Sequence, residues 1–257
     1  GETLLPDEAG FSLESLSPDM TVAVFSNPST GIVIGRTVPS GEAIWSVRAK
    51  QGTGIGSFLF SPDGSIFAAR TIEGLVLFFD AAIHSAPPLE PMEPIASFAG
   101  HPAFNHYSPL AFGPGGRIVA IPEHDGTVGI YAPVHGSAVG AEAVLLHPDT
   151  VLAAHFESDS RYVVTACYDG RIRRWDVDSG RVTGEIAAHT GPITHMVPSA
   201  DFRLWLTSST DQSRKVIDMQ NVRVVNEQFS DRPVNYAGGP RGPLMRIGAN
   251  AASRRAF

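Results

Sequence analysis

The sequence predicts an all-β protein built from six tandem copies of a four-stranded antiparallel unit. Three features recur at one spacing: a turn at positions 157 and 199, an acidic residue at 169 and 211, and a histidine at 147 and 189, each pair 42 residues apart. The 26 glycines and 20 prolines suit a fold with many turns. A sequence that repeats at this length indicates a structural unit that buries its faces against its neighbours.

The first strand of each unit is expected to be short, apolar and innermost. Gly56–Phe60 ("GSFLF") is such a segment, and Thr150–Phe156 and Pro192–Val197 echo it. A tight turn follows, as in Ser61–Gly64, because Asp and Gly tolerate left-handed backbone angles. We therefore expect a hairpin from the first strand into the second.

The second and third strands are expected to pair through an acidic turn. Alternating apolar residues predict second strands at Ser65–Arg70 and Arg161–Cys167, and Arg181–Ile186 is interpreted as an outermost strand. The turn into the third strand places an acidic residue six positions before a bulky one. The pairs are Glu73 with Phe79, Asp125 with Tyr131, Asp169 with Trp175, and Asp211 with Ile217.

The repeats resemble those of the WD-repeat β-propeller family. Four-stranded units of about 40–45 residues with Gly-His and Trp-Asp dipeptides are typical of that family. Gly100-His101 and Trp175-Asp176 match these dipeptides, and the resemblance extends over nearly the whole chain, with divergent repeats. It implies a β-propeller, in which each repeat is one antiparallel blade of a disc.

The resemblance also implies a structural role for several polar residues. In the family, a loop His, a second-strand Ser or Thr, the turn Asp and the third-strand Trp form a buried hydrogen-bonded tetrad. Carried over by position, the matching residues are His147, Thr165, Asp169 and Trp175 in the fourth blade, His189, Thr207 and Asp211 in the fifth, and His101 and Asp125 in the third. Ile217, Tyr131 and Ile121 depart from the pattern. Buried polar groups need partners, so we interpret this set as scaffold and expect no catalytic residues.

The whole chain, residues 1–257, is expected to be a single propeller domain. The expected blades are approximately 9–40, 41–98, 99–146, 147–187, 188–229, and 230–257 closed by an outer strand at 1–8. The sixth blade rests on the alignment of 239–257 with 157–175. A seventh repeat in a longer parent protein remains an alternative.

Two arginines interrupt the apolar pattern of the third strands. Arg174 and Arg214 fall where other blades carry apolar residues. Each side chain either packs its stem while the guanidinium reaches an acid or solvent, or forms a basic anchor between neighbouring blades.

The expected function is a non-enzymatic scaffold that binds a protein or peptide on the loop-bearing rim of the propeller. Candidate partner-binding residues lie in a long rim loop of the third blade and the matching loop of the sixth, since aromatic and Arg side chains dominate interface energetics. They are Phe104, His106, Tyr107, Arg232 and Tyr236.

Two alternatives place function elsewhere. One is a propeller enzyme, or a small-ligand or metal-binding module, that uses the central channel, where His155 and His195 would lie. The other is a sensor domain of a larger regulatory protein. No cofactor is expected, and no metal is expected because no Cys/His metal spacing is present. No Gly-x-Ser-x-Gly elbow is present either, so Ser/His/Asp catalysis has no anchor.

Composition narrows the partner class and the location. The net charge of −7 argues against nucleic acid as the main partner, because phosphate binding rests on clustered Lys and Arg. Cys167 is the single cysteine, which excludes an internal disulfide framework. No apolar run approaches the roughly 20 residues that a membrane span needs. Without a visible signal peptide, we expect a cytoplasmic or nuclear protein.

Overall fold

The computed structural model is an array of four-stranded antiparallel sheets, which confirms the predicted all-β propeller architecture. It describes residues 10–27, 29–48, 55–71, 73–81, 92–99, 110–123, 125–133 and 142–229. Twenty strands in these residues form five sheets, each in chain order along the sheet. The predicted sixth blade, 230–257 with 1–8, lies outside the described residues. Nothing in the described part of the chain is a helix long and apolar enough to cross a membrane.

The strand bounds follow the predicted units closely. The first sheet is β1 (Ser12–Leu16), β2 (Val22–Asn27), β3 (Ile32–Thr37) and β4 (Ala43–Arg48). The second is β5 (Ile55–Phe60), β6 (Ile66–Thr71), β7 (Leu75–Asp80) and β8 (Ala96–Ala99). The third is β9 (Ala111–Phe112), β10 (Val119–Pro122), β11 (Thr127–Tyr131) and β12 (Ala143–Leu146). The fourth is β13 (Val151–Phe156), β14 (Tyr162–Cys167), β15 (Arg171–Asp176) and β16 (Arg181–Ala187). The fifth is β17 (Ile193–Pro198), β18 (Leu204–Ser209), β19 (Ser213–Asp218) and β20 (Arg223–Phe229).

One boundary differs from the expected blades. β4 belongs to the first sheet, whereas the repeat spacing places its residues in the second blade. The reason is that β4 continues the β3 hairpin, with Val33 opposite Val47 and Gly35 opposite Trp45. The last strand of a sheet therefore stays with the strand before it in the chain.

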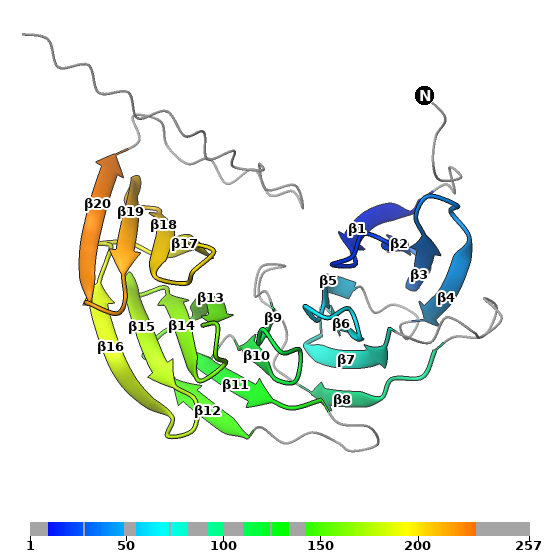
Figure 1. Cartoon of the computed structure of the whole chain (residues 1–257), viewed down its shortest axis with the longest axis horizontal. Helices are drawn as coiled ribbons and strands as arrows, with labels where there is room; N and C mark the ends of the chain where they lie inside the picture. The colour runs from blue at the N-terminus through cyan, green and yellow to red at the C-terminus, as the bar shows by residue number, and fades with distance from the viewer. Residues whose placement is uncertain are drawn as a thin grey trace, which may run out of the picture.

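The five sheets follow one another along an arc, with the first strand of each sheet toward the inside and the last strand at the perimeter (Figure 1). The first and fifth sheets are the two ends of this arc (Figure 1). This arrangement gives the second, third and fourth sheets a neighbour on each face.

Within the described residues, the hydrophobic core forms four clusters, one between each pair of successive sheets. Trp45, Phe60 and Phe67 belong to the cluster between the first and second sheets. The next two clusters join the second sheet to the third and the third to the fourth. Trp205 and Ile217, both fully buried, belong to the cluster between the fourth and fifth sheets. In the second, third and fourth sheets, alternating side chains of the second strands therefore pack against two different sheets, as the nearly continuous burial of β6, β10 and β14 shows.

Turns between the second and third strands require a left-handed residue. Gly74, Gly126 and Gly170 hold this position with φ of 94°, 86° and 76°. In the fifth sheet the same position is Gln212, with φ of 68° and an exposed side chain. A residue with a Cβ atom is strained in this conformation by about 1–2 kcal/mol.

Gln212→Gly is therefore expected to stabilise the protein. We expect the free energy of unfolding to rise by about 0.5–1 kcal/mol, because the relieved strain exceeds the entropy that glycine loses on folding. Chemical denaturation followed by circular dichroism measures the change. Gln228→Gly is the matched control: Gln228 is exposed in the extended strand β20, so the same substitution should destabilise the protein. Destabilisation by both substitutions would contradict the prediction.

Candidate functional site

The candidate site is the rim where the second-to-third-strand turns meet the loops that enter each new sheet. In the fourth and fifth sheets this rim is described in full. The backbone N–H of His147 donates to the Gly126 carbonyl at 2.9 Å, and that of His189 donates to the Gly170 carbonyl at 3.0 Å. Each histidine loop is thus tied to the turn of the preceding sheet, so the rim joins successive blades.

A chain of hydrogen bonds lies beneath this rim in the fourth sheet. His147 Nδ1 is 3.1 Å from the Gly126 carbonyl, which can only accept, so Nδ1 carries the proton. His147 Nε2 then accepts from the Thr165 hydroxyl at 2.8 Å, and the Trp175 indole N–H donates to that hydroxyl at 2.9 Å. All three side chains are buried. The network therefore requires a neutral imidazole.

Burial keeps His147 neutral. It lowers the pKa of His147 to about 4, an effect that the hydrogen bond to Gly126 only partly offsets. An imidazolium would also lose the acceptor nitrogen that Thr165 uses. His147 is therefore suited to a structural role and not to proton transfer near neutral pH.

Asp169 does not join this network, although the resemblance places it there. Its Oδ2 is 2.6 Å from Arg173 Nη2, and its Oδ1 accepts from the Arg171 backbone N–H at 2.9 Å. Burial opposes ionisation of Asp169, but the hydrogen bonds from Arg173 and the Arg171 backbone, together with the positive charge of Arg173, outweigh it and lower the pKa of Asp169. Arg173 also lies 3.5 Å from Glu185, so its buried guanidinium is held by two carboxylates.

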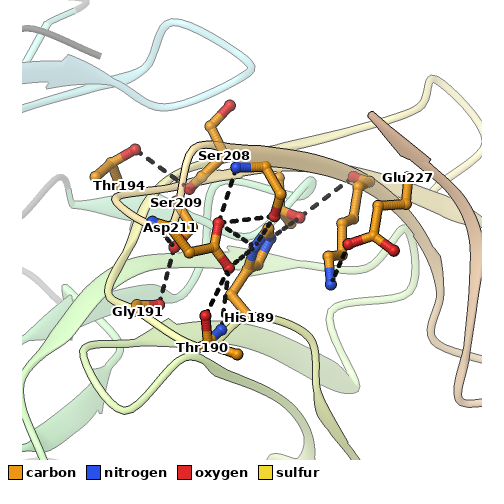
Figure 2. A network of polar contacts seen from close by, with 11 residues as sticks. His189, Thr190, Gly191, Thr194, Ser208, Ser209, Asp211 and Glu227 are labelled. Atoms are coloured by element: carbon orange, nitrogen blue, oxygen red, sulfur yellow. Dashed lines mark hydrogen bonds and ion pairs between the residues drawn. The ribbon is translucent and has the colours of Figure 1, made fainter. Parts of the chain in front are cut away.

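In the fifth sheet the aspartate does meet the histidine, as Figure 2 shows. His189 Nδ1 lies 3.1 Å from Asp211 Oδ2, and His189 Nε2 lies 2.8 Å from the Thr207 hydroxyl. Asp211 also accepts from the Ser213 hydroxyl at 2.7 Å and the Thr190 backbone N–H at 3.0 Å. Burial opposes ionisation of Asp211, but these donors outweigh it and hold its pKa well below the ordinary value.

The difference between the two sheets has a local cause. Ile217 replaces the tryptophan in the fifth sheet and packs in the core, so it offers Thr207 no N–H donor. The residue two positions after Asp211 is Ser213, whose hydroxyl lies 2.9 Å from His189 Nδ1. Lys215, which corresponds to Arg173, pairs with Glu227 at 2.8 Å, so Asp211 binds the histidine instead.

The third sheet keeps less of the predicted tetrad. Asp125 is exposed and caps its own turn, accepting from the Thr127 backbone N–H at 2.9 Å and from its hydroxyl at 2.6 Å. Tyr131 is buried and its ring lies 4.2 Å from that of Phe98 in the second sheet. Ile121 is fully buried, and His101 lies outside the described residues.

The predicted partner-binding residues cannot be placed on the rim. Phe104, His106, Tyr107, Arg232 and Tyr236 all lie outside the described residues. The described rim instead presents Tyr168, a side chain that sequence reasoning missed and that is 53% exposed. Its backbone N–H donates to the Thr150 carbonyl at 2.8 Å, which holds the residue at the turn. An aromatic residue directly before an Asp-Gly turn is the signal that could have identified it.

The inner strands offer little support for a channel site. His155 Nε2 lies 3.0 Å from the Met196 carbonyl, so this imidazole joins β13 to β17, and burial lowers its pKa. His195 is exposed, with Nδ1 3.1 Å from the Thr194 hydroxyl. Across the ranges that the structure describes, no three His, Cys, Asp or Glu side chains are placed to hold a metal ion.

The two interrupting arginines have different environments. Arg174 binds Glu157 of its own sheet through two contacts, Nε to Oε1 at 2.6 Å and Nη2 to Oε2 at 2.8 Å. Its guanidinium carbon lies 3.4 Å from the centre of the Tyr162 ring. Arg174 therefore packs its stem and reaches an acid within one blade. Arg214 is exposed on β19.

Comparisons with known proteins agree with this geometry. Residues 143–176 match the family described as "WD domain, G-beta repeat". The chain is 34% identical over 104 residues to an uncharacterized WD repeat-containing protein of Schizosaccharomyces pombe, covering 40% of this chain and 25% of that protein. It is 31% identical over 75 residues to eukaryotic translation initiation factor 3 subunit I of Bombyx mori, covering 29% and 23%.

A second group of similarities extends the comparison. The U5 small nuclear ribonucleoprotein 40 kDa protein of Dictyostelium discoideum is 28% identical over 89 residues, which is 34% of this chain and 25% of that protein. A chain in the structure titled "Crystal Structure of Mitotic Checkpoint Complex" has the same fold, with a TM-score of 0.67 and 16% identity, covering 90% of this chain and 67% of that one. The matched segments span about a quarter of the length of these curated relatives.

Proposed function

Because this chain is built from WD-type repeats, we propose that it is a non-enzymatic scaffold that binds a protein or peptide on the loop-bearing rim. The observation that carries the proposal is the use of its buried polar side chains. His147, Thr165 and Trp175 satisfy one another, and His189, Thr207 and Asp211 do the same in the next sheet. Side chains that are fully hydrogen-bonded inside the blades are not available to a substrate.

The packing of the sheets supports the rim as the binding surface. Core clusters occupy the spaces between successive sheets, so the faces of the inner blades are not accessible. Exposed surface that can vary without loss of the core lies in the turns and loops, where binding residues are commonly found. Tyr168 is an aromatic side chain of the kind that dominates interface energetics.

The relatives support the class of partner. Their names describe a subunit of a translation initiation factor and a component of a small nuclear ribonucleoprotein. By this similarity we propose that the chain also works within a protein assembly, in the cytoplasm or nucleus. The net charge of −7 argues against nucleic acid as its main partner.

Rim variants test the proposal. We expect Tyr168→Ala, Tyr107→Ala or Arg232→Ala to reduce recovery of at least one partner at least tenfold when the immobilised chain captures proteins from a cell extract, since a residue central to an interface contributes about 2 kcal/mol or more. Quantitative mass spectrometry of the captured proteins measures the change.

Met20→Ala is the matched control. Met20 is 59% exposed but lies in a first-to-second-strand turn, at the opposite ends of the strands. It should leave recovery unchanged, and circular dichroism should show that each variant keeps its sheets. The proposal would be contradicted if all three rim variants recover every captured protein at the level of the parent protein.

A further inference from the structure

An ion pair is buried between the second and third sheets. Arg70 Nη2 in β6 lies 3.0 Å from Glu123 Oε2, directly after β10, and the two side chains are 3% and 6% exposed. Arg70 Nη1 also donates to the Pro122 carbonyl at 2.9 Å. The guanidinium of one sheet therefore binds both the backbone and a side chain of the next.

The surroundings of this pair are apolar. Arg70 lies opposite Val76 in the neighbouring strand, and Val76, Ala68, Val119 and Ile121 are fully buried in the same core cluster. Charges in such an environment are strongly unfavourable unless they are paired. The charges also reach Tyr131: burial raises its pKa to about 12, and the negative charge of Glu123 adds to this rise.

The equivalent positions in the other sheets carry no charge. At the position of Arg70 the other sheets have Ser26, Pro122, Ala166 and Ser208. At the position of Glu123 they have Asn27, Thr71, Cys167 and Ser209. A sheet other than the third would therefore give Arg70 no carboxylate at this place, and a sheet other than the second would give Glu123 no cation.

We propose that the Arg70–Glu123 pair selects the neighbour of the second sheet, so that β5–β8 dock on β9–β12 and on no other sheet of the array. Similar sheets in tandem can dock in the wrong order or exchange between molecules, and buried charges act against such arrangements. The correct neighbour brings the two opposite charges together, whereas any other described sheet places a neutral side chain at that position.

A double-mutant cycle tests whether the pair is coupled. Arg70→Met and Glu123→Leu are each expected to raise the unfolding equilibrium constant at least about 100-fold, because each removes the opposite charge beside a buried ionic side chain. The double variant should recover most of this loss, since an apolar pair replaces the ionic one. Denaturant titration of the 257-residue chain measures the four constants. Coupling below about threefold would overturn the proposal.

Refolding tests whether the pair also selects the neighbour of the second sheet. The double variant, diluted from denaturant at rising protein concentration, should form more associated species than the parent, as measured by size exclusion with light scattering. It keeps an apolar interface, so it stays measurable even where a single variant does not fold. Arg214→Met with Glu142→Leu makes the same two types of substitution at exposed positions and should refold like the parent. If the Arg70→Met/Glu123→Leu variant refolds to the same fraction of monomer as the parent protein, the proposal that the pair selects the neighbouring sheet is overturned.

Discussion

Replacing Thr165 by valine is expected to lower the free energy of unfolding by about 3 kcal/mol. The two side chains have nearly the same shape, so the substitution removes a hydroxyl and leaves no cavity. The Trp175 N–H, 2.9 Å from that hydroxyl, and His147 Nε2, at 2.8 Å, then remain buried without a partner. Each unsatisfied buried group contributes a loss of about 1–3 kcal/mol.

Denaturant unfolding followed by tryptophan fluorescence measures this loss, because Trp175 is a member of the network. Thr183→Val is the matched control. Thr183 is exposed on β16, so the same chemical change should alter stability by less than about 0.5 kcal/mol. A Thr165→Val variant that unfolds within 1 kcal/mol of the parent would show that the network adds little to stability, about the net value of one ordinary hydrogen bond.

Acidification from pH 7 to pH 5 is expected to destabilise the protein by about 2 kcal/mol through His147 alone. Burial lowers the pKa of His147 to about 4, from 6.5 in the unfolded chain. Below pH 6.5 the unfolded state therefore binds a proton that the folded state excludes until the pH nears 4. Stability from this residue is complete above pH 6.5 and decreases as the pH falls between these two values.

His189 changes stability in the same direction. Burial lowers its pKa, although Asp211 opposes this effect with its negative charge. Lys215 lowers the pKa slightly further, while Glu227 raises it. The pKa of Asp211 is itself lowered from 3.8, so its contribution decreases only in more acidic solution. The range from pH 7 to pH 5 therefore reports mainly on the imidazoles.

Urea unfolding midpoints measured across this pH range test the prediction. His147→Gln should flatten the pH dependence, because glutamine does not bind a proton. His195→Gln, which removes an exposed imidazole, should leave the slope unchanged. An identical slope in His147→Gln and the parent would contradict the assignment of the acid response to His147.

Strand positions and their order could be predicted because their signals are local. Alternating apolar residues and Asp-Gly turns placed the inner strand at Gly56–Phe60, and β5 spans Ile55–Phe60. The shared spacing of 42 residues likewise indicated that the fourth and fifth sheets have the same plan. Such patterns depend on neighbours in the chain, so a single sequence contains them.

The partners of the polar side chains could not be predicted with the same success. Asp169 and Asp211 occupy the same position of the repeat, yet Asp169 binds Arg173 whereas Asp211 binds His189. The outcome depends on which donor lies within reach after the strands pair. Ser213 donates its hydroxyl to Asp211, whereas Arg171, at the same repeat position, donates its backbone N–H to Asp169. Arg173 binds Asp169, whereas its counterpart Lys215 binds Glu227.

By itself, the sequence determined that this chain forms tandem four-stranded sheets, since backbone alternation and turn chemistry act over a few residues. Only the tertiary structure decided which charges meet between sheets. Arg70 and Glu123 are 53 residues apart, and their ion pair exists because two core faces close around it. The energy of a buried charge depends on its surroundings in three dimensions, and those surroundings come from segments that a repeat pattern does not relate.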